Sequence, residues 1–213
     1  MDFISTLMVA LIIANLWLLG TSRIGSCIRI VALQGIFLGV LPLLVQQGGP
    51  SLRFLVLAAG SIGLRGIVFP WLLLRALRDV NARREVEPYV GYTVSIIVGV
   101  LALMLSLWLD TKIALPDIAP SPLMVPAALS TMFVGLFLII SRKKALTQIL
   151  GYIVLENGIY TLGLAMIDRM PVLVELGVLL DAFVAVFVMS VATYRISREF
   201  DHIDIEKLDT LKG

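Results

Sequence analysis

The chain has 213 residues, of which 59% are hydrophobic and 15% charged, with a mean hydropathy of +1.00 and a net charge of +2. A soluble domain of this length could not cover so much apolar surface, and the near balance of charge gives no reason to expect a nucleic-acid partner. A single Cys and a single His exclude a disulfide framework and a metal site built by this chain alone.

Long apolar runs dominate the chain. A membrane-spanning helix needs about 20 mainly apolar residues, and seven runs approach or exceed this length. In chain order the predicted spans are 3–20, 24–45, 52–77, 92–109, 125–140, 145–167 and 172–193. The sequence therefore predicts an all-α, polytopic membrane protein with seven transmembrane helices.

The connections between these runs alternate in charge. Basic residues gather at the ends that follow spans one, three, five and seven: Arg23, Arg29, Arg75, Arg78, Arg83, Arg84, Arg142, Lys143, Lys144, Arg195 and Arg198. The opposite ends carry only Arg53, Lys112 and Arg169. Because cytoplasmic connections are enriched in Lys and Arg, we expect the N-terminus outside and the C-terminus in the cytoplasm.

Two polar or proline-rich connections suggest a division into units. Residues 78–89 form the longest polar connection, and the segment 110–122 contains Pro116, Pro120 and Pro122. We therefore expect an N-terminal three-helix unit (1–77), a middle part with the cytoplasmic connection, the fourth helix and an outer loop (78–124), a C-terminal three-helix unit (125–193) and a polar cytoplasmic tail (194–213).

Two carboxylates lie near the middle of predicted spans, Glu156 in the sixth and Asp181 in the seventh. Ionisable groups at this depth are costly and usually face a protein interior or a hydrated path. Because the two spans are antiparallel neighbours, Glu156 and Asp181 should lie at similar depth and could pass a proton between them. The alternative is that each acid only hydrogen-bonds a neighbouring helix. Glu175 lies near the outer end of its span, where its position at the interface explains it, and it is a further possible site residue.

Arg65 lies near the middle of the third span, and Pro70 follows five residues later. An arginine keeps its charge, so we expect it to pair with Glu156, with Asp181 or with a carboxylate of another subunit. The alternative is a purely structural ion pair. Proline removes a backbone donor, so a kink is expected beside Arg65. Gly35, Gly39 and the small residues of 59–63 predict close helix contacts.

The C-terminal unit resembles a known family. Arg142, Lys143 and Lys144 lead into the stretch 151–160, which reads Gly-Tyr-Ile-Val-Leu-Glu-Asn-Gly-Ile-Tyr, and Asp181 and a tail containing Ile203-Asp204 follow. This pattern is similar to the three-helix K subunit of respiratory complex I and to the C subunit of Mrp-type cation antiporters, although those proteins carry a second Glu in place of Asp181. With its extra N-terminal helices, the whole chain resembles the hydrogenase-4 component E family.

The resemblance implies a non-redox membrane subunit of a hydrogenase or formate hydrogenlyase-like, complex I-related assembly in the cell inner membrane. It implies proton or sodium translocation through Glu156, Asp181 and Arg65, with Lys143 and Lys144 as possible contributors. The chain would hold no cofactor and no catalytic site. Antiporter-like membrane subunits and a cytoplasmic module with nickel–iron and iron–sulfur centres would be its partners. A subunit of a Mrp-type antiporter, or a structural membrane scaffold, is the alternative.

Overall fold

The computed structural model describes residues 3–45, 52–79, 89–113 and 119–166, and its regular elements in these ranges are all helices. In chain order they are α1 (Phe3–Gly20), α2 (Ile24–Val45), α3 (Leu52–Ser61), the π-helix η1 (Ile62–Val68), α4 (Phe69–Asp79), α5 (Tyr92–Ile113), α6 (Met124–Ser141) and α7 (Ala145–Ala165). The all-helical fold predicted from the sequence is confirmed.

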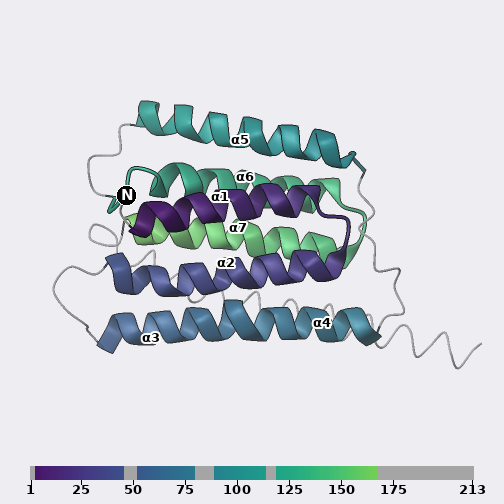
Figure 1. The fold of residues 1–213 in the computed structure, drawn as a ribbon, viewed down its shortest axis with the longest axis horizontal. Coiled ribbons are helices and arrows are strands. Elements are labelled where there is room, and N and C mark those ends of the chain that lie inside the picture. The colour runs from purple at the N-terminus through teal and green to yellow at the C-terminus, as the bar shows by residue number, and fades with distance from the viewer. Residues whose placement is uncertain (1–2, 46–51, 80–88, 114–118, 167–213) are drawn as a thin grey trace, which may run out of the picture.

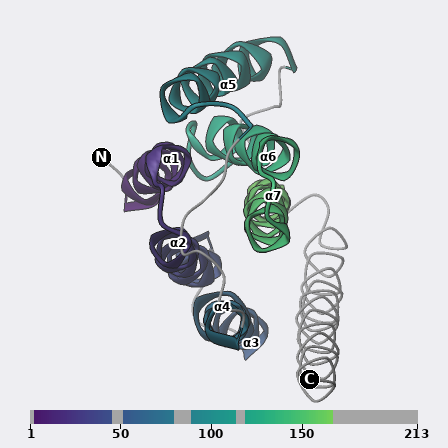
Figure 2. The same cartoon turned by 90° about the vertical axis from the view of Figure 1, so that its right-hand side faces the viewer.

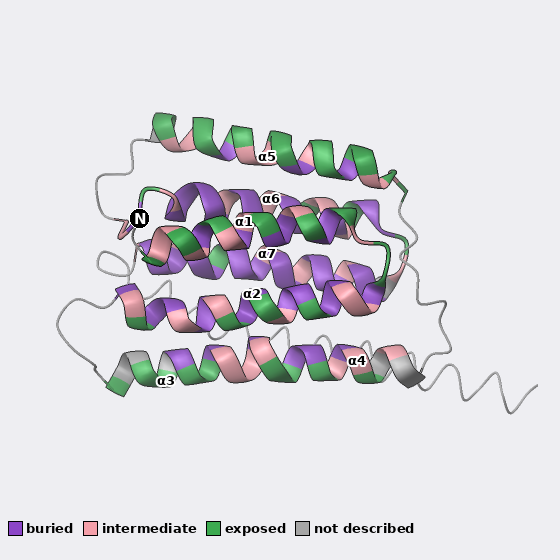
Figure 3. Ribbon diagram, in the orientation of Figure 1, coloured by how far each residue is buried: buried purple, intermediate pink, exposed green. Residues whose placement is uncertain are grey.

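The helices lie side by side with roughly parallel axes (Figure 1). Helices α6 and α7 form the closest pair, α1 and α2 pack beside them, and α3, η1 and α4 continue one another as a single rod against α2. Viewed along the helix axes, α5 lies on the opposite side of the bundle, against α6 and α1 (Figure 2). The two outer elements, α5 and the α3–α4 rod, carry most of the exposed apolar side chains (Figure 3).

Four helices of the described chain are long and apolar enough to cross a membrane, namely 3–20, 24–45, 92–112 and 124–141. They coincide within a few residues with the first, second, fourth and fifth predicted spans. The third predicted span is the rod of α3, η1 and α4, and the sixth is α7. The seventh span, with Glu175 and Asp181, and the polar tail lie outside the described residues, so the count of seven and the orientation stay predictions.

Glycines bring helix backbones into direct contact. A Cβ atom at Gly151 would lie 2.8 Å from the backbone nitrogen of Ile139, and one at Gly158 would lie 2.7 Å from that of Met132, so α6 and α7 touch along their length. On α2, a Cβ at Gly35 would meet the backbone of Arg65. The predicted contact at Gly35 and Gly39 is therefore present.

The same prediction for the small residues of 59–63 is met in part among the described residues. Ser61 is buried in the bundle, and Ile62 of this run lies against Gly39 of α2. Cβ atoms placed at Gly60 or Gly63 would have no described atom within 4 Å, so a close contact at these two glycines stays a prediction.

Two apolar clusters fill the bundle, one toward each end. The first joins the end of α1 to the beginnings of α2 and α7, and contains Phe69 of α4 and Leu138 of α6. The second joins the beginnings of α1 and α6 to the ends of α2 and α7. Between them, at the middle of the helices, lies a layer of buried polar side chains: Asn15, Gln34, Ser61, Arg65, Thr131, Glu156, Asn157 and Thr161. This layer is the candidate site.

Candidate functional site

Arg65 lies in the π-helix η1, where each hydrogen-bonded turn of the rod contains one more residue than a turn closed by four-residue hydrogen bonds. The backbone N–H of Phe69 bonds to the carbonyl of Leu64, five residues back, in place of the usual four. Pro70 comes one residue after Phe69 and has no N–H to donate in the α-helical pattern. In place of the kink predicted beside Arg65, the structure has this π-helical segment within one continuous rod. π-Helical turns are frequent at functional sites because they reorient one side chain. Here the reoriented segment carries Arg65 into the bundle, where its side chain is 1% exposed.

The Arg65 guanidinium has three kinds of partner. Its Nη2 lies 3.3 Å from Oε1 of Glu156 and its Nη1 donates to Oδ1 of Asn157 at 3.0 Å. The ring of Tyr160 lies under the guanidinium, 4.1 Å from its central carbon, and the Ser61 hydroxyl contacts the Tyr160 hydroxyl at 2.9 Å. Cation–π contacts strengthen where water is excluded. The charge is thus compensated by one turn of α7.

A line of amide side chains extends from this ion pair across the bundle. Asn157 donates to Gln34 at 3.5 Å, Gln34 donates to Asn15 at 2.9 Å, and Asn15 donates to the Thr131 hydroxyl at 2.8 Å. Thr131 in turn donates to the carbonyl of Ala127, one turn earlier in α6. All four side chains are nearly completely buried. The line therefore connects α7, α2, α1 and α6 at one level.

The structure brings together two of the residues expected from the sequence and separates others. Arg65 and Glu156 form the ion pair. Lys143 and Lys144 lie at the start of α7, about 18 Å along the helix from Glu156, and the ammonium of Lys143 lies over the ring of Tyr89, 5.0 Å from its centroid. Asp181 and Glu175 lie outside the described residues.

The amides and Tyr160 were not among the site residues expected from the sequence. Their signal is present in the sequence, since Asn15, Gln34 and Asn157 interrupt long apolar runs. An amide in the middle of a membrane helix must find a partner inside the protein, which makes it an informative position. Among the described residues no group of three or more His, Cys, Asp or Glu could hold a metal ion. The charged groups that the described part of the site brings together are Arg65 and Glu156.

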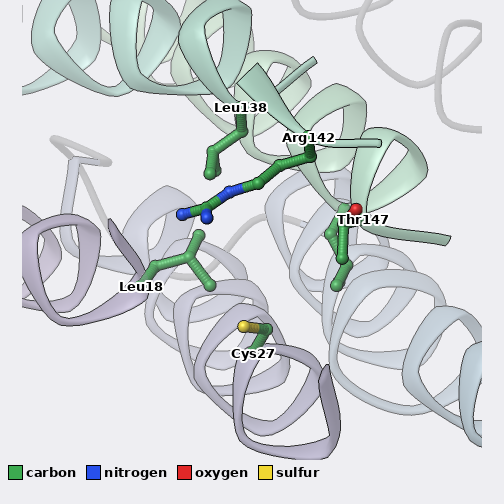
Figure 4. A pocket seen from close by; sticks show the side chains of 6 residues that line it. Leu18, Cys27, Leu138, Arg142 and Thr147 are labelled. Atoms are coloured by element: carbon green, nitrogen blue, oxygen red, sulfur yellow. The ribbon is translucent and has the colours of Figure 1, made fainter. Parts of the chain in front are cut away.

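A second buried arginine, Arg142, lies at one end of the bundle beside a cavity of about 10 Å³, the size of one water molecule (Figure 4). Its Nη2 donates to the carbonyl of Leu19 at the end of α1, and its guanidinium faces the ring of Tyr92 on α5. Burial lowers the pKa of Arg142 from its ordinary value. Cys27 of α2 lines the same cavity. Arg142 thus links four helices, away from the central ion pair.

Known proteins resemble the chain in two ways. Residues 123–213 match the family of NADH-ubiquinone/plastoquinone oxidoreductase chain 4L. An uncharacterized protein of Mycobacterium tuberculosis is 29% identical over 203 residues, which cover 95% of this chain and 92% of that protein. Hydrogenase-4 component E of Escherichia coli K12 is 27% identical over 161 residues, 76% of this chain and 74% of that protein, and its Shigella flexneri counterpart gives the same values. No solved structure matches the chain.

Proposed function

We propose that this chain supplies a link for proton or sodium transfer in a hydrogenase or formate hydrogenlyase-like assembly related to complex I. The chain belongs to the hydrogenase-4 component E family, and its C-terminal part is of the chain 4L type. Glu156 and Asp181 are the groups that bind and release the ion, and Arg65 compensates their charge. The chain works in the cell inner membrane as a seven-span subunit, with the unit boundaries at residues 77, 124 and 193. Antiporter-like membrane subunits and a cytoplasmic module with nickel–iron and iron–sulfur centres are its partners.

The ion pair between Arg65 and Glu156 carries this proposal. Glu156 belongs to the segment that matches chain 4L, whereas Arg65 belongs to the helices that precede it. The N-terminal helices therefore contribute a permanent charge to a carboxylate of the 4L-type part. A charge pair at the middle of a membrane bundle is costly to maintain, and such pairs typically mark ion pathways.

A structural scaffold is the second candidate, and one observation favours it. The polar layer is extensively hydrogen-bonded from Arg65 to Ala127, as expected of side chains that only hold helices together. The two candidates differ in what happens when a carboxylate loses its charge. A scaffold needs only the hydrogen bonds, whereas ion transfer needs a group that titrates.

Glu156→Gln therefore tests the proposal. The amide keeps the shape and the acceptor oxygen for Arg65 but cannot take up a proton at neutral pH. In sealed inverted vesicles we expect less proton translocation per hydrogen evolved, with the complex still assembled. Asp110→Asn, which removes a carboxylate at the end of α5, is the matched control and should leave translocation unchanged. Normal coupling in Glu156→Gln would leave the scaffold as the function.

Loss of assembly in Glu156→Gln would have a different cause, because the variant removes the carboxylate that lies 3.3 Å from the buried Arg65 guanidinium. The double variant Arg65→Gln/Glu156→Gln removes both charges and keeps hydrogen-bonding groups at both positions. We expect it to assemble better than Glu156→Gln and to be deficient in translocation. Asp181→Asn should show a similar deficit, and the combination with Glu156→Gln should be less than additive.

A further inference from the structure

The hydrogen bonds that lead from Arg65 to Thr131 run in one direction. Arg65 donates to Asn157, Asn157 to Gln34, Gln34 to Asn15, and Asn15 to Thr131. Each amide uses its oxygen toward Arg65 and its nitrogen away from it. The result is a single file of donors that begins at a cation and crosses four helices.

This direction follows from the chemistry of Arg65. A guanidinium has five N–H donors and no acceptor, so the group that faces Nη1 must present an oxygen. With its oxygen turned to Arg65, Asn157 presents its NH₂ to Gln34, and the same arrangement is repeated through Gln34 and Asn15 to Thr131. The hydroxyl of Thr131, having accepted from Asn15, gives its proton to the carbonyl of Ala127. Any amide turned the other way would place two donors or two acceptors face to face.

A line of hydrogen bonds aligned in this way stabilises the charged Arg65 guanidinium from which it starts. Each bond polarises the next one, and the bonds strengthen one another in a low-dielectric interior. The file also restricts the rotamers of Arg65, whose side chain is long and flexible. The same guanidinium donates from Nη1 to Asn157 and from Nη2 to Glu156. The bond to Asn157 therefore fixes the orientation in which Arg65 faces Glu156.

We propose that Asn157, Gln34 and Asn15, anchored on Thr131, are positioning residues that hold Arg65 against Glu156, and that this file closes the ion path on the α1–α2 side of the site. Amides and a threonine do not titrate, and passing a proton along the file would require every amide to turn and release Arg65. The closure of the ion path rests on the proposed function, whereas the positioning of Arg65 rests on the geometry alone.

Breaking the file far from Arg65 tests the inference. Gln34→Met removes the middle of the file at nearly constant length, and Thr131→Val removes its anchor at constant shape. Thr131→Ser keeps the hydroxyl and serves as the conservative rescue. Ser130→Ala is the matched control, because the Ser130 hydroxyl is buried in the same turn of α6 and bonds only to the Ala127 carbonyl of its own helix.

The first readout is the position of Arg65 in the purified complex, determined by electron cryomicroscopy. The quantity measured is the ratio of molecules with Arg65 at Glu156 to molecules with Arg65 displaced. In Gln34→Met and in Thr131→Val we expect this ratio to fall roughly fivefold, the factor that corresponds to one buried hydrogen bond. Thr131→Ser and Ser130→Ala should keep Arg65 in place. If Arg65 stays at Glu156 in Gln34→Met and in Thr131→Val, the inference is wrong, whatever the transport activity.

The second readout is proton translocation per hydrogen evolved in inverted vesicles. Gln34→Met and Thr131→Val should lower it, and Gln34→Met should cause no further loss in a Glu156→Gln background, because the file acts only through that pair. A merely structural role would lower assembly equally in both backgrounds. Normal translocation in Glu156→Gln would refute the proposed function, and Arg65 density would then decide the positioning role by itself. Normal translocation in Gln34→Met beside a deficient Glu156→Gln would refute the positioning role alone.

Discussion

Gly35 of α2 is the position where one added methyl group should disturb the site most directly. A Cβ atom there would lie 2.7 Å from the carbonyl carbon of Arg65 and 2.8 Å from its oxygen and its Cβ. Ordinary carbon contacts begin at about 3.5 Å, so α2 and η1 would have to separate by roughly 0.7 Å. Backbone atoms cannot rotate out of the way as a flexible side chain can.

The expected cost of Gly35→Ala follows from this geometry. Overpacking a tight contact costs about 1–3 kcal/mol, against which alanine gains about 0.5–1 kcal/mol over glycine in a helix. Because the atoms in the way belong to the Arg65 backbone, we take the upper part of that range, about 2–3 kcal/mol. The expected net destabilisation is then about 1–2.5 kcal/mol, equivalent to a thermal midpoint about 2–10 °C lower for a chain of this size. The separation would also move Arg65 relative to Glu156 and Asn157, so translocation should fall as well.

Gly25→Ala is the matched control on the same helix, because a Cβ at Gly25 would have no heavy atom of the described residues within 4 Å. Its midpoint should be unchanged or slightly raised. The assay is the temperature at which the chain dissociates from the purified complex, followed by size-exclusion chromatography, together with proton translocation in vesicles. A midpoint for Gly35→Ala equal to that of Gly25→Ala would refute the close approach of α2 to η1 on which this reasoning depends.

Two further predictions concern the ion pair and the topology. Arg65→Ala removes the guanidinium that is paired with the buried Glu156, so it should destabilise the complex by about 3–5 kcal/mol and reduce the amount of chain that co-purifies with it. Arg65→Lys keeps the charge without the planar fork and should be intermediate. Wild-type yield for Arg65→Ala would contradict a compensated pair. Lys112 and Lys143 are exposed at opposite ends of the bundle. In a Cys27→Ser background, a membrane-impermeant thiol reagent should therefore label Lys112→Cys in intact cells and Lys143→Cys only in inverted vesicles, and labelling of Lys143→Cys from outside would reverse the predicted orientation.

The positions of most helices, and the ion pair of Arg65 and Glu156 within the site, follow from local properties of the chain. The apolar runs located α1, α2, α5 and α6 within a few residues, because the thickness of a membrane sets the length of a spanning helix. Arg65 and Glu156 could be selected one residue at a time, because an ionisable group in the middle of such a run is costly wherever it points. Pro70 predicted a kink beside Arg65, and the structure has the π-helix η1 within a continuous rod there instead.

Other features depend on which helices are neighbours, and the tertiary structure alone decided them. Asn15 and Gln34 each need a partner inside the protein, but their own spans do not say which one. They form a single file with Thr131 because α1, α2 and α6 pack beside α7 at matching heights. Gly35 meets Arg65 whereas Gly63 meets no described atom, although both are glycines in apolar helices. Apolar periodicity determines that a helix exists, but the rotation and axial position of each helix are set by close packing against its neighbours, and these decide which partner a buried polar group finds.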